Sequence, residues 1–461
     1  MDAADAGIDL ARVATLKAAE DERFAADHPR SLALLERGRA SMPRGVPLVW
    51  MRFFYDHPPM FVAGADGSRF TDVDGNQYVD FHFGITIAST GHTPAPVVRA
   101  VTERIRTGIQ FMLPTEDAVV VSEELARRWG LPKWQYALSS SQSINDAIRL
   151  ARAITGRERL VVFEGKYHGQ LAELLAVEGD AGEPEPEYHG LTDADIARTT
   201  ILTWNDLDAV ERTLAPGDVA LLMAEPVLTN SGLVFPDPGF HEALRELTER
   251  HGALLLIDET QTLPMAYGGL MREMGLRADM VALGKSIGGG VPVGALGMTE
   301  EVARAIDYEN EPYEVMGEAV DEPAIGGTMY GNALSMAALR AAVLEVWTEE
   351  THARMRALAH DLGDRMRAAI RAHGRDWDVY AFGNRAGYRF GPNPPRTNRE
   401  AGDLDLPPVR HLQRVYMANR GIWDFGWWGG PLVSAQSTAE DVDRYAETFD
   451  AFLGDLMGDG R

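Results

Sequence analysis

Short apolar runs alternate with amphipathic stretches through the middle of the chain, between about residues 134 and 298. The two clearest runs, 253–257 and 280–283, are continuous and end in polar residues. Such short runs are typical of strands buried on both faces of a parallel sheet, and the stretches between them are long enough for helices. This alternation predicts an α/β fold with a mostly parallel central sheet.

The hydrophobic pattern differs on both sides of this region. Apolar residues at helical spacing within 8–38 predict two amphipathic helices, which separate near His28. Alternating residues and Asp-Gly turns in 60–84 predict an antiparallel meander. Near the end of the chain we predict a last helix capped by Thr438.

Composition and charge restrict the possible functions. The chain has 461 residues, enough for two or more domains, and carries a net charge of −25 at pH 7. Such a surface repels nucleic acid and anionic membranes. The absence of cysteine excludes disulfides and thiolate chemistry. Since no apolar run reaches the roughly 18 residues of a membrane helix and the N-terminus lacks a signal-peptide pattern, we expect a cytoplasmic protein.

The two apolar runs deliver an acid and an amine to one edge of the predicted sheet. Asp258 and Glu259 follow the first run, and Lys285 follows the second, just before three glycines. Ligand groups gather at the carboxyl ends of parallel strands, so we expect Asp258 and Lys285 to lie close together. Pyridoxal phosphate requires this pair, because an amine forms its Schiff base and a carboxylate keeps its pyridine nitrogen protonated.

Two other interpretations of Lys285 compete with this one. Lysine side chains are mostly exposed, so a lysine after a strand is often only a surface group. The tripeptide Gly284-Lys285-Ser286 also occurs in P-loops, but that motif requires a glycine where this chain has Asp279. The P-loop is therefore excluded, and the order of the two strand ends favours pyridoxal phosphate.

From about residue 61 to its end the chain resembles the class III aminotransferases, which are pyridoxal-phosphate enzymes of fold type I. The similarity is greatest to the branch of glutamate-1-semialdehyde aminomutase, and the meander sequence FTDVDGNQYVDF is one of its signatures. The resemblance implies that Lys285 is the Schiff-base lysine and Asp258 the partner of the pyridine nitrogen. It also implies three segments: an N-terminal arm with part of a small α+β domain (1–95), a large cofactor-binding domain (96–342), and the rest of the small domain (343–461). The last segment is predicted to contain the family's late strand, at 433–437.

The resemblance assigns further cofactor contacts. Where the family has a phosphate-binding SGTE motif, this chain has Ser139-Ser140-Ser141-Gln142, so Ser140 and Ser141 keep hydroxyls. Hydroxyls at a helix N-terminus commonly serve only as caps, although the same geometry binds phosphate. Tyr167 of the family's YHG motif stacks on the cofactor ring, which places it among the catalytic residues with Lys285 and Asp258.

Four other positions complete the predicted cofactor site. His168 either lines the site or orients Tyr167, and Glu225 lies close to the cofactor. Thr260 replaces the Val or Ile that usually lies under the pyridine ring. Thr328, in a GGT segment, donates to the phosphate of the neighbouring subunit. This last contact implies a homodimer, which can double to a tetramer, with active sites at the interface.

The substrate pocket is predicted from segments that vary more within the family. The carboxylate-binding arginine of the aminomutase and of some β-amino-acid enzymes falls near Trp50, and Arg52, two positions away, can substitute for it if the loop shifts. The aminomutase's glutamate near the C-terminus falls at Gly429. Aromatic residues crowd 423–428, where they either form a core cluster or favour an apolar or aromatic amine. The predicted pocket residues are Trp50, Arg52, Ile85, Trp427 and Trp428, and no metal ligands are assigned.

These assignments predict a transaminase that transfers an amino group to an oxo acid such as pyruvate. The favoured donors are aromatic or apolar amines and β-amino acids. The alternative is a 2,1-aminomutase of the glutamate-1-semialdehyde type, which uses the same residues but moves the amine within one molecule. A third possibility, a catalytically silent cofactor-binding protein, is disfavoured by the intact Asp258 and Lys285.

Overall fold

The computed structural model describes residues 6–53, 55–179, 183–307, 323, 325–424, 426 and 430–458. The chain divides into two compact units. The first unit comprises Met1–Pro94, Ala353–Pro395 and Glu400–Arg461, and the second comprises Ala95–His352 and Arg396–Arg399. Within the described residues, no helix combines the length and apolar character that a membrane crossing requires.

A seven-stranded sheet forms the centre of the second unit, in the order β4-β12-β11-β10-β9-β5-β8. Strand β12 is antiparallel to both of its neighbours, and the other neighbouring pairs are parallel. The predicted α/β fold with a mostly parallel sheet is therefore confirmed. The strands are β4 (Lys133–Ala137), β5 (Arg159–Phe163), β8 (Thr199–Leu202), β9 (Val219–Ala224), β10 (Leu254–Asp258), β11 (Met280–Leu283) and β12 (Gly294–Met298).

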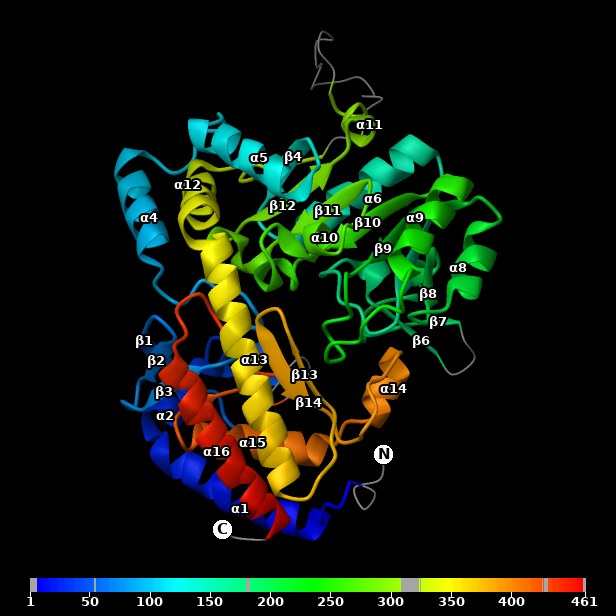
Figure 1. The fold of residues 1–461 in the computed structure, drawn as a ribbon. Coiled ribbons are helices and arrows are strands. Elements are labelled where there is room, and N and C mark those ends of the chain that lie inside the picture. Colours follow the sequence, from blue (N-terminus) through cyan, green and yellow to red (C-terminus); the bar gives the residue numbers. More distant parts are fainter. Residues whose placement is uncertain are drawn as a thin grey trace. The chain divides into compact units, whose positions relative to one another are not determined.

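Helices surround this sheet (Figure 1), and its strands β9 and β11 are buried along their whole length. Burial on both faces explains why these strands appear in the sequence as continuous apolar runs. Ile144 and Ile148 of α6 pack with strand residues such as Leu221 and Leu256 in one hydrophobic cluster. The helices of this unit include α4 (Ala95–Thr107), α5 (Glu116–Trp129), α6 (Ser140–Thr155), α7 (Asp193–Ile196), α8 (Leu207–Leu214), α9 (Phe240–His251), α10 (Gly269–Glu273), α11 (Glu300–Ala303) and α12 (Ala333–Ala341).

The topology brings several strand ends to one edge of the sheet. Strands β4, β5, β9, β10 and β11 run in the same direction, so their carboxyl ends share this edge. The segments that leave these ends contain almost all of the predicted cofactor residues. In parallel α/β sheets this edge is where ligands bind. A small antiparallel pair, β6 (Ala176–Glu178) and β7 (Pro184–Pro186), lies outside the main sheet.

The first unit contains the helices and the meander predicted for the N-terminal region. Helices α1 (Leu10–Asp27) and α2 (Pro29–Gly38) separate at His28, as expected. Strands β1 (Val62–Asp66), β2 (Arg69–Asp72) and β3 (Gln77–Asp80) are antiparallel, and β15 (Ile422–Trp423) pairs parallel to β3. The other main elements are α3 (Trp50–Phe53), α13 (Glu349–Ala372), β13 (Val379–Phe382), β14 (Arg385–Tyr388), α14 (Asn398–Asp403), α15 (Pro407–Ala418) and α16 (Ala439–Met457), of which α13 and α14 extend across the unit boundaries.

One local prediction near the C-terminus is confirmed and one is wrong. Thr438 caps α16 in a capping box with Asp441, as the sequence indicated. The strand predicted over 433–437 is absent, because the chain makes a turn there and pairs only through an isolated bridge between Arg385 and Leu432.

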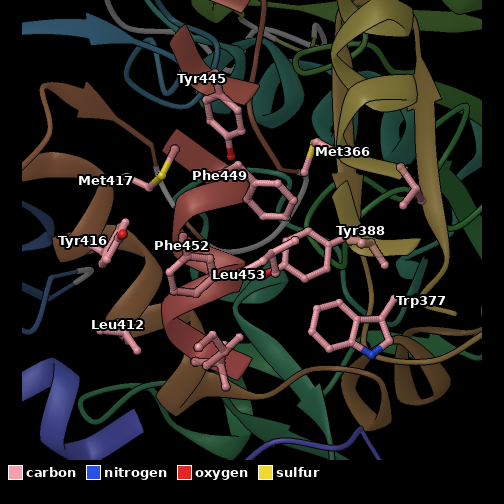
Figure 2. Packing of buried hydrophobic residues seen from close by; sticks show 14 of the residues in the cluster. Met366, Trp377, Tyr388, Leu412, Tyr416, Met417, Tyr445, Phe449, Phe452 and Leu453 are labelled. Carbon is pink, nitrogen blue, oxygen red and sulfur yellow. The ribbon is translucent and has the colours of Figure 1, made fainter. Parts of the chain in front are cut away.

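Aromatic side chains form much of the core of the first unit (Figure 2). The rings of Trp377 and Tyr388 are stacked, with centroids 5.6 Å apart, and Phe390 meets Trp377 edge-on at 4.9 Å. Offset and edge-to-face pairs add specific geometry to the large apolar area that such residues bury. This core therefore holds helices from both ends of the chain in one compact unit.

Candidate cofactor site at the sheet edge

Asp258 is a buried carboxylate at the end of β10. Its Oδ2 lies 2.8 Å from Nδ1 of His168, and its Oδ1 accepts a hydrogen bond from the Thr260 N–H at 2.9 Å. Burial by itself would raise the pKa of Asp258, but the hydrogen bond and charge of His168, with the bonds from Thr260, bring the pKa below its ordinary value. Asp258 is therefore anionic at neutral pH, as a partner for a protonated pyridine nitrogen must be.

Glu259, the next residue, has a different environment. Its carboxylate accepts hydrogen bonds from the Thr262 hydroxyl at 2.6 Å and from the N–H groups of Leu270 and Met271 at 3.0 and 2.6 Å. These two N–H groups belong to the first turn of α10, so Glu259 satisfies donors that the helix leaves unpaired. Burial raises the pKa of Glu259 to about 7. The geometry therefore gives Glu259 a structural role. The sequence alone did not distinguish this role from that of Asp258.

Lys285 leaves the strand next to that of Asp258. In the parallel pair of β10 and β11, Asp258 is level with Ala282, so Lys285 follows three residues beyond this register. Lys285 is half-buried and begins the short 3-10 helix η4 (Lys285–Gly288) with a φ of 49°. A Cβ on the preceding Gly284 would lie 2.8 Å from Cβ of Ser140. Glycine at 284 therefore lets this turn approach the N-terminus of α6.

Glu225 follows β9 and is completely buried. Thr229 donates a hydrogen bond to its Oε2, whereas Oε1 has no hydrogen-bond partner among the described residues. Burial raises the pKa of Glu225 to about 7, although the nearby charges of His168 and Lys285 oppose this rise. His168 thus interacts with two carboxylates, Asp258 and Glu225. The sequence predicted that His168 lines the site or orients Tyr167, and did not predict its hydrogen bond to Asp258.

The N-terminus of α6 lies at the same edge. Ser139, which the sequence analysis did not include among the site residues, caps this helix by accepting a hydrogen bond from the Gln142 N–H at 3.4 Å. Ser140 is buried, and its hydroxyl accepts a 2.6 Å hydrogen bond from the Thr260 hydroxyl. The structure therefore brings together two predicted cofactor residues that are 120 positions apart in the chain.

Ser141 contacts the loop that follows β5, and Tyr167 belongs to this loop. The Ser141 hydroxyl accepts a hydrogen bond from the Gln170 N–H at 3.2 Å. A Cβ on Gly169 would lie only 2.2 Å from this hydroxyl, so the close approach requires glycine. Tyr167 is half-buried, and its pKa is raised by burial against a hydrogen bond with Gln170. The hydroxyls of Ser140 and Ser141 thus occupy the first turn of a helix, a position that suits a phosphate.

Thr328 lies on the surface of the second unit. Its side chain is exposed, and its carbonyl accepts a 2.9 Å hydrogen bond from the Gln110 side chain. The preceding Gly326 donates its N–H to the buried carboxylate of Asp146 on α6. The loop that carries Thr328 is thereby attached to the same helix whose N-terminus holds Ser140 and Ser141.

The predicted pocket residues that the structure describes belong to the first unit. Trp50 and Arg52 lie on α3, and the Arg52 guanidinium donates to the His57 carbonyl at 2.9 Å. Ile85 has a φ of 58°, within a turn whose residues 83–86 all have positive φ. Trp423 packs against Tyr55 with ring centroids 5.3 Å apart. Phe425, Trp427, Trp428 and Gly429 lie outside the described residues.

The family description of the class III aminotransferases matches residues 53–384. This chain belongs to the class III aminotransferase family. It is similar over 98% of its length to a glutamate-1-semialdehyde aminomutase from Pseudomonas aeruginosa PAO1, solved in complex with PMP, at 37% identity and a TM-score of 0.92, covering 100% of that chain. A glutamate-1-semialdehyde 2,1-aminomutase from Sorangium cellulosum is 32% identical over 424 residues, which are 90% of this chain and 94% of the relative.

A second kind of class III enzyme is also similar in structure. A β-phenylalanine aminotransferase from Variovorax paradoxus is 26% identical, with a TM-score of 0.83, over 96% of this chain and 97% of its own. The family and the fold type I architecture expected from the sequence are therefore confirmed. The relatives named aminomutase are the more similar in sequence.

The residues at the sheet edge fit the cofactor that the resemblance implies. A buried anion, an amine on the neighbouring strand and hydroxyls at a helix N-terminus match the three polar parts of pyridoxal phosphate. Glu225 Oε1, which has no hydrogen-bond partner among the residues that the structure describes, also offers a buried acceptor near Asp258 and Lys285. In the part of the chain that the structure describes, no three His, Asp or Glu residues are grouped as metal ligands.

Proposed function

We propose that this class III aminotransferase uses pyridoxal phosphate to move an amino group within one molecule, as a 2,1-aminomutase of an amino-aldehyde such as glutamate 1-semialdehyde. The observation that carries the proposal is the similarity, over nearly the whole chain, to proteins named as this aminomutase. It favours the aminomutase over the transaminase that the sequence analysis placed first. The polar residues at the sheet edge support amine chemistry of either kind.

When bound, the cofactor supplies an aldehyde that links to amines and a ring that withdraws electrons from the carbon next to the linked nitrogen. Asp258 provides a fixed negative charge for the ring nitrogen, because its environment keeps its pKa low. His168 donates to Asp258 from Nδ1 and fixes the orientation of this carboxylate. Together these residues keep the ring in its electron-withdrawing, protonated form.

Lys285 supplies the amine that holds the cofactor aldehyde between turnovers. Once a substrate amine had displaced it, Lys285 Nζ would be free to accept a proton from the substrate carbon next to the amine nitrogen and to donate that proton again. Glu225 lies close enough for the charge of Lys285 to affect its pKa. A carboxyl whose pKa is about 7 can gain or lose a proton near neutral pH without leaving a permanent buried charge.

The phosphate is held by Ser140, Ser141 and the first N–H groups of α6, and by Thr328 of a second subunit. A homodimer is supported by the exposed apolar side chains beside Thr328. Met112 and Leu113 are 69% and 71% exposed, and Gln110, close to them in sequence, donates its side-chain hydrogen bond to the Thr328 carbonyl. Monomers rarely expose apolar residues in such a group unless a partner covers them.

Complementation between two inactive variants tests this dimer. Lys285→Ala removes the amine from one chain, and Thr328→Ala removes the predicted phosphate contact that the chain gives to its partner. In a mixed dimer, the site with its own Lys285 receives Thr328 from the other chain. We expect co-refolded mixtures to regain activity that neither variant has alone, and to elute as dimers. Activity that stays at the level of the separate variants would contradict a shared site.

A transaminase is the second candidate function, and Trp50 is the observation that favours it. The aminomutase branch has a carboxylate-binding arginine near this position, whereas this chain has an indole, and the Arg52 guanidinium is bonded to the His57 carbonyl. A pocket without this arginine is better suited to an apolar or aromatic amine. The similarity to the β-phenylalanine aminotransferase supports transaminase chemistry in general, because that donor itself carries a carboxylate.

One spectral experiment separates the two candidates. The cofactor-loaded protein is mixed, without an acceptor, with glutamate 1-semialdehyde, β-amino acids, aromatic amines or α-amino acids. Isomerisation of the semialdehyde by catalytic amounts of enzyme, with little response to the other amines, is the expected result. Stoichiometric conversion of the bound cofactor to its amine form by one class of amine, without isomerisation, would establish a transaminase and identify its donor.

A further inference from the structure

We propose that Trp347 is a positioning residue for Lys285. The indole of Trp347, held in place by Arg128, fixes the backbone turn from which the Lys285 amine extends. The proposal rests on the function proposed above for Lys285. All of the residues involved lie within the second unit, the hydrogen bonds of Trp347 with Ser286 and of Arg128 with Trp347 and Val343 are buried, and Trp347 itself is 3% exposed.

The turn at Lys285 is strained. A φ of 49° is in the left-handed region, which residues with a Cβ rarely adopt. The turn contains two local hydrogen bonds, from Ile287 N to Gly284 O at 3.1 Å and from Gly289 N to Ser286 O at 3.0 Å. Strained backbone of this kind persists only when surrounding structure holds it. A contact from outside the turn is therefore needed to hold it.

Trp347 makes such a contact. Its indole Nε1–H donates to the carbonyl of Ser286 at 3.3 Å, across 61 positions of the chain. Ser286 is completely buried and is the residue directly after Lys285. The Ser286 carbonyl thus accepts one hydrogen bond from within the turn and one from Trp347. A bond at this peptide restricts rotation of the backbone next to Lys285.

The position of Trp347 depends on a change in helix type. Helix α12 continues into a π-helix, η5 (Ala342–Val346), at whose end the Trp347 N–H bonds to the Ala342 carbonyl at 2.9 Å. In an α-helix this N–H would bond to the Val343 carbonyl. The Val343 carbonyl accepts instead from Arg128 Nη2 at 2.7 Å, and the Trp347 carbonyl accepts from Arg128 Nη1 at 2.6 Å.

Arg128 is well suited to this task, because its planar guanidinium can bond two carbonyls at once. It is 4% exposed, and its Nε donates to Glu124 at 2.7 Å. The ring of Tyr267 lies under the guanidinium, 4.4 Å from its central carbon. Tyr267 precedes α10, whose first N–H groups are bonded by Glu259. Through the chain between Tyr267 and α10, these contacts connect the helix that Glu259 caps with the residue after Lys285.

The test removes only the indole N–H, by Trp347→Phe. The matched control is Trp134→Phe, since Trp134 is also buried in this unit and its indole donates to a backbone carbonyl, that of Leu131, at 2.9 Å. For each variant the rate at which added pyridoxal phosphate links to Lys285 is followed by absorbance, and borohydride reduction with peptide mass analysis identifies the modified lysine. The pH midpoint of the cofactor absorbance and the melting temperature are also measured.

We expect Trp347→Phe to slow the linkage about 3- to 10-fold, as the loss of one net hydrogen bond predicts, and to shift the pH midpoint. Trp134→Phe should lower the melting temperature similarly and change neither of these quantities. Arg128→Lys keeps the charge but cannot bond both carbonyls, so it should slow the linkage too. The double variant Arg128→Lys/Trp347→Phe should slow the linkage by less than the product of the two single effects, because both changes disrupt the same contact with the Ser286 carbonyl.

Equal linkage rates and pH midpoints for Trp347→Phe and Trp134→Phe would overturn the proposal. If Trp347→Phe does not fold, Arg128→Lys against the same control decides the question in the same way. Failure of the unaltered protein to link pyridoxal phosphate at Lys285 would instead overturn the proposed function, and the positioning role with it. These two failures are distinguished by the borohydride-trapped peptide.

Discussion

The sheet edge of the second unit and the aromatic core of the first unit both bury carboxylates, but the two environments shift the carboxylate pKa in opposite directions. In the first unit, Asp424 accepts hydrogen bonds from the Tyr445 hydroxyl at 2.6 Å and the Gly426 N–H at 3.1 Å. Burial raises the pKa of Asp424 despite these bonds. At the sheet edge, His168 and Thr260 lower the pKa of the equally buried Asp258.

The difference teaches that burial alone does not identify a functional acid. Asp424 is buried and accepts hydrogen bonds from Tyr445 on α16 and Gln413 on α15, so it joins these two helices. Asp258 shares a histidine with Glu225, one of whose oxygens has no partner in the described structure. Perturbed and incompletely bonded titratable groups gather where a ligand binds. The variants below test whether the two regions differ in function as they differ in structure.

Replacement of Lys285 should have the largest effect. Lys285→Ala removes the only amine that the site offers in this proposal, so turnover should fall by about 1,000-fold or more. The sequence contains four lysines, Lys17, Lys133, Lys166 and Lys285, and borohydride trapping of pyridoxal phosphate should modify the last of them. Lys133→Ala, at a half-exposed position where the lysine pairs with Asp307, is the control and should be trapped and active as the unaltered protein is. Retained turnover in Lys285→Ala would refute the assignment.

Asp258→Asn should have the next largest effect on turnover, because it replaces the negative charge that the ring nitrogen requires by a neutral group of the same shape. We expect kcat to fall about 100-fold or more, as the loss of a buried ionic partner predicts. The neighbouring Glu259→Gln should instead lower the melting temperature more than it lowers kcat. If Glu259→Gln reduces kcat as much as Asp258→Asn does, Glu259 does not have a purely structural role.

Asp424→Asn should affect stability rather than chemistry. The change disturbs the hydrogen bond from Tyr445 within the buried network, so the free energy of unfolding should fall by about 1–3 kcal/mol in urea denaturation. Tyr445→Phe removes the other partner of this bond and should cost about 1 kcal/mol. A large loss of kcat in the folded Asp424→Asn protein, at unchanged stability, would place this acid with the functional groups instead.

Glu225→Gln should have the smallest effect, visible in the pH dependence of stability. The pKa of Glu225 is raised from its ordinary value of 4.5 to about 7, so the folded state keeps a proton that the unfolded state releases. The contribution of Glu225 is therefore complete below pH 4.5 and declines as the pH rises through 7. Between pH 4.5 and 7 we expect the melting temperature of Glu225→Gln to decline less than that of the unaltered protein. An unchanged slope would show that Glu225 ionises as an exposed carboxyl does.

Much of the fold follows from the sequence alone. The continuous apolar runs before Asp258 and Lys285 are buried parallel strands because both faces of such a sheet are covered, and this pattern is local. The helix break at His28 and the capping box at Thr438 were predicted for the same reason, since each depends on a few adjacent residues. The motifs that follow the two apolar runs also carry the resemblance to the family, which the match over residues 53–384 confirms.

Only the tertiary structure decided which residues share an environment. The hydroxyls of Ser140 and Thr260, the ring of His168 and the carboxylate of Asp258, and the indole of Trp347 and the Ser286 carbonyl are joined across 120, 90 and 61 positions. No local pattern contains such pairs, because they depend on strand order and on the direction in which each strand ends. The same is true of Asp258 and Glu259, which are adjacent in sequence. Strand order and side-chain direction bring Asp258 to His168 and bring Glu259 to the first N–H groups of α10.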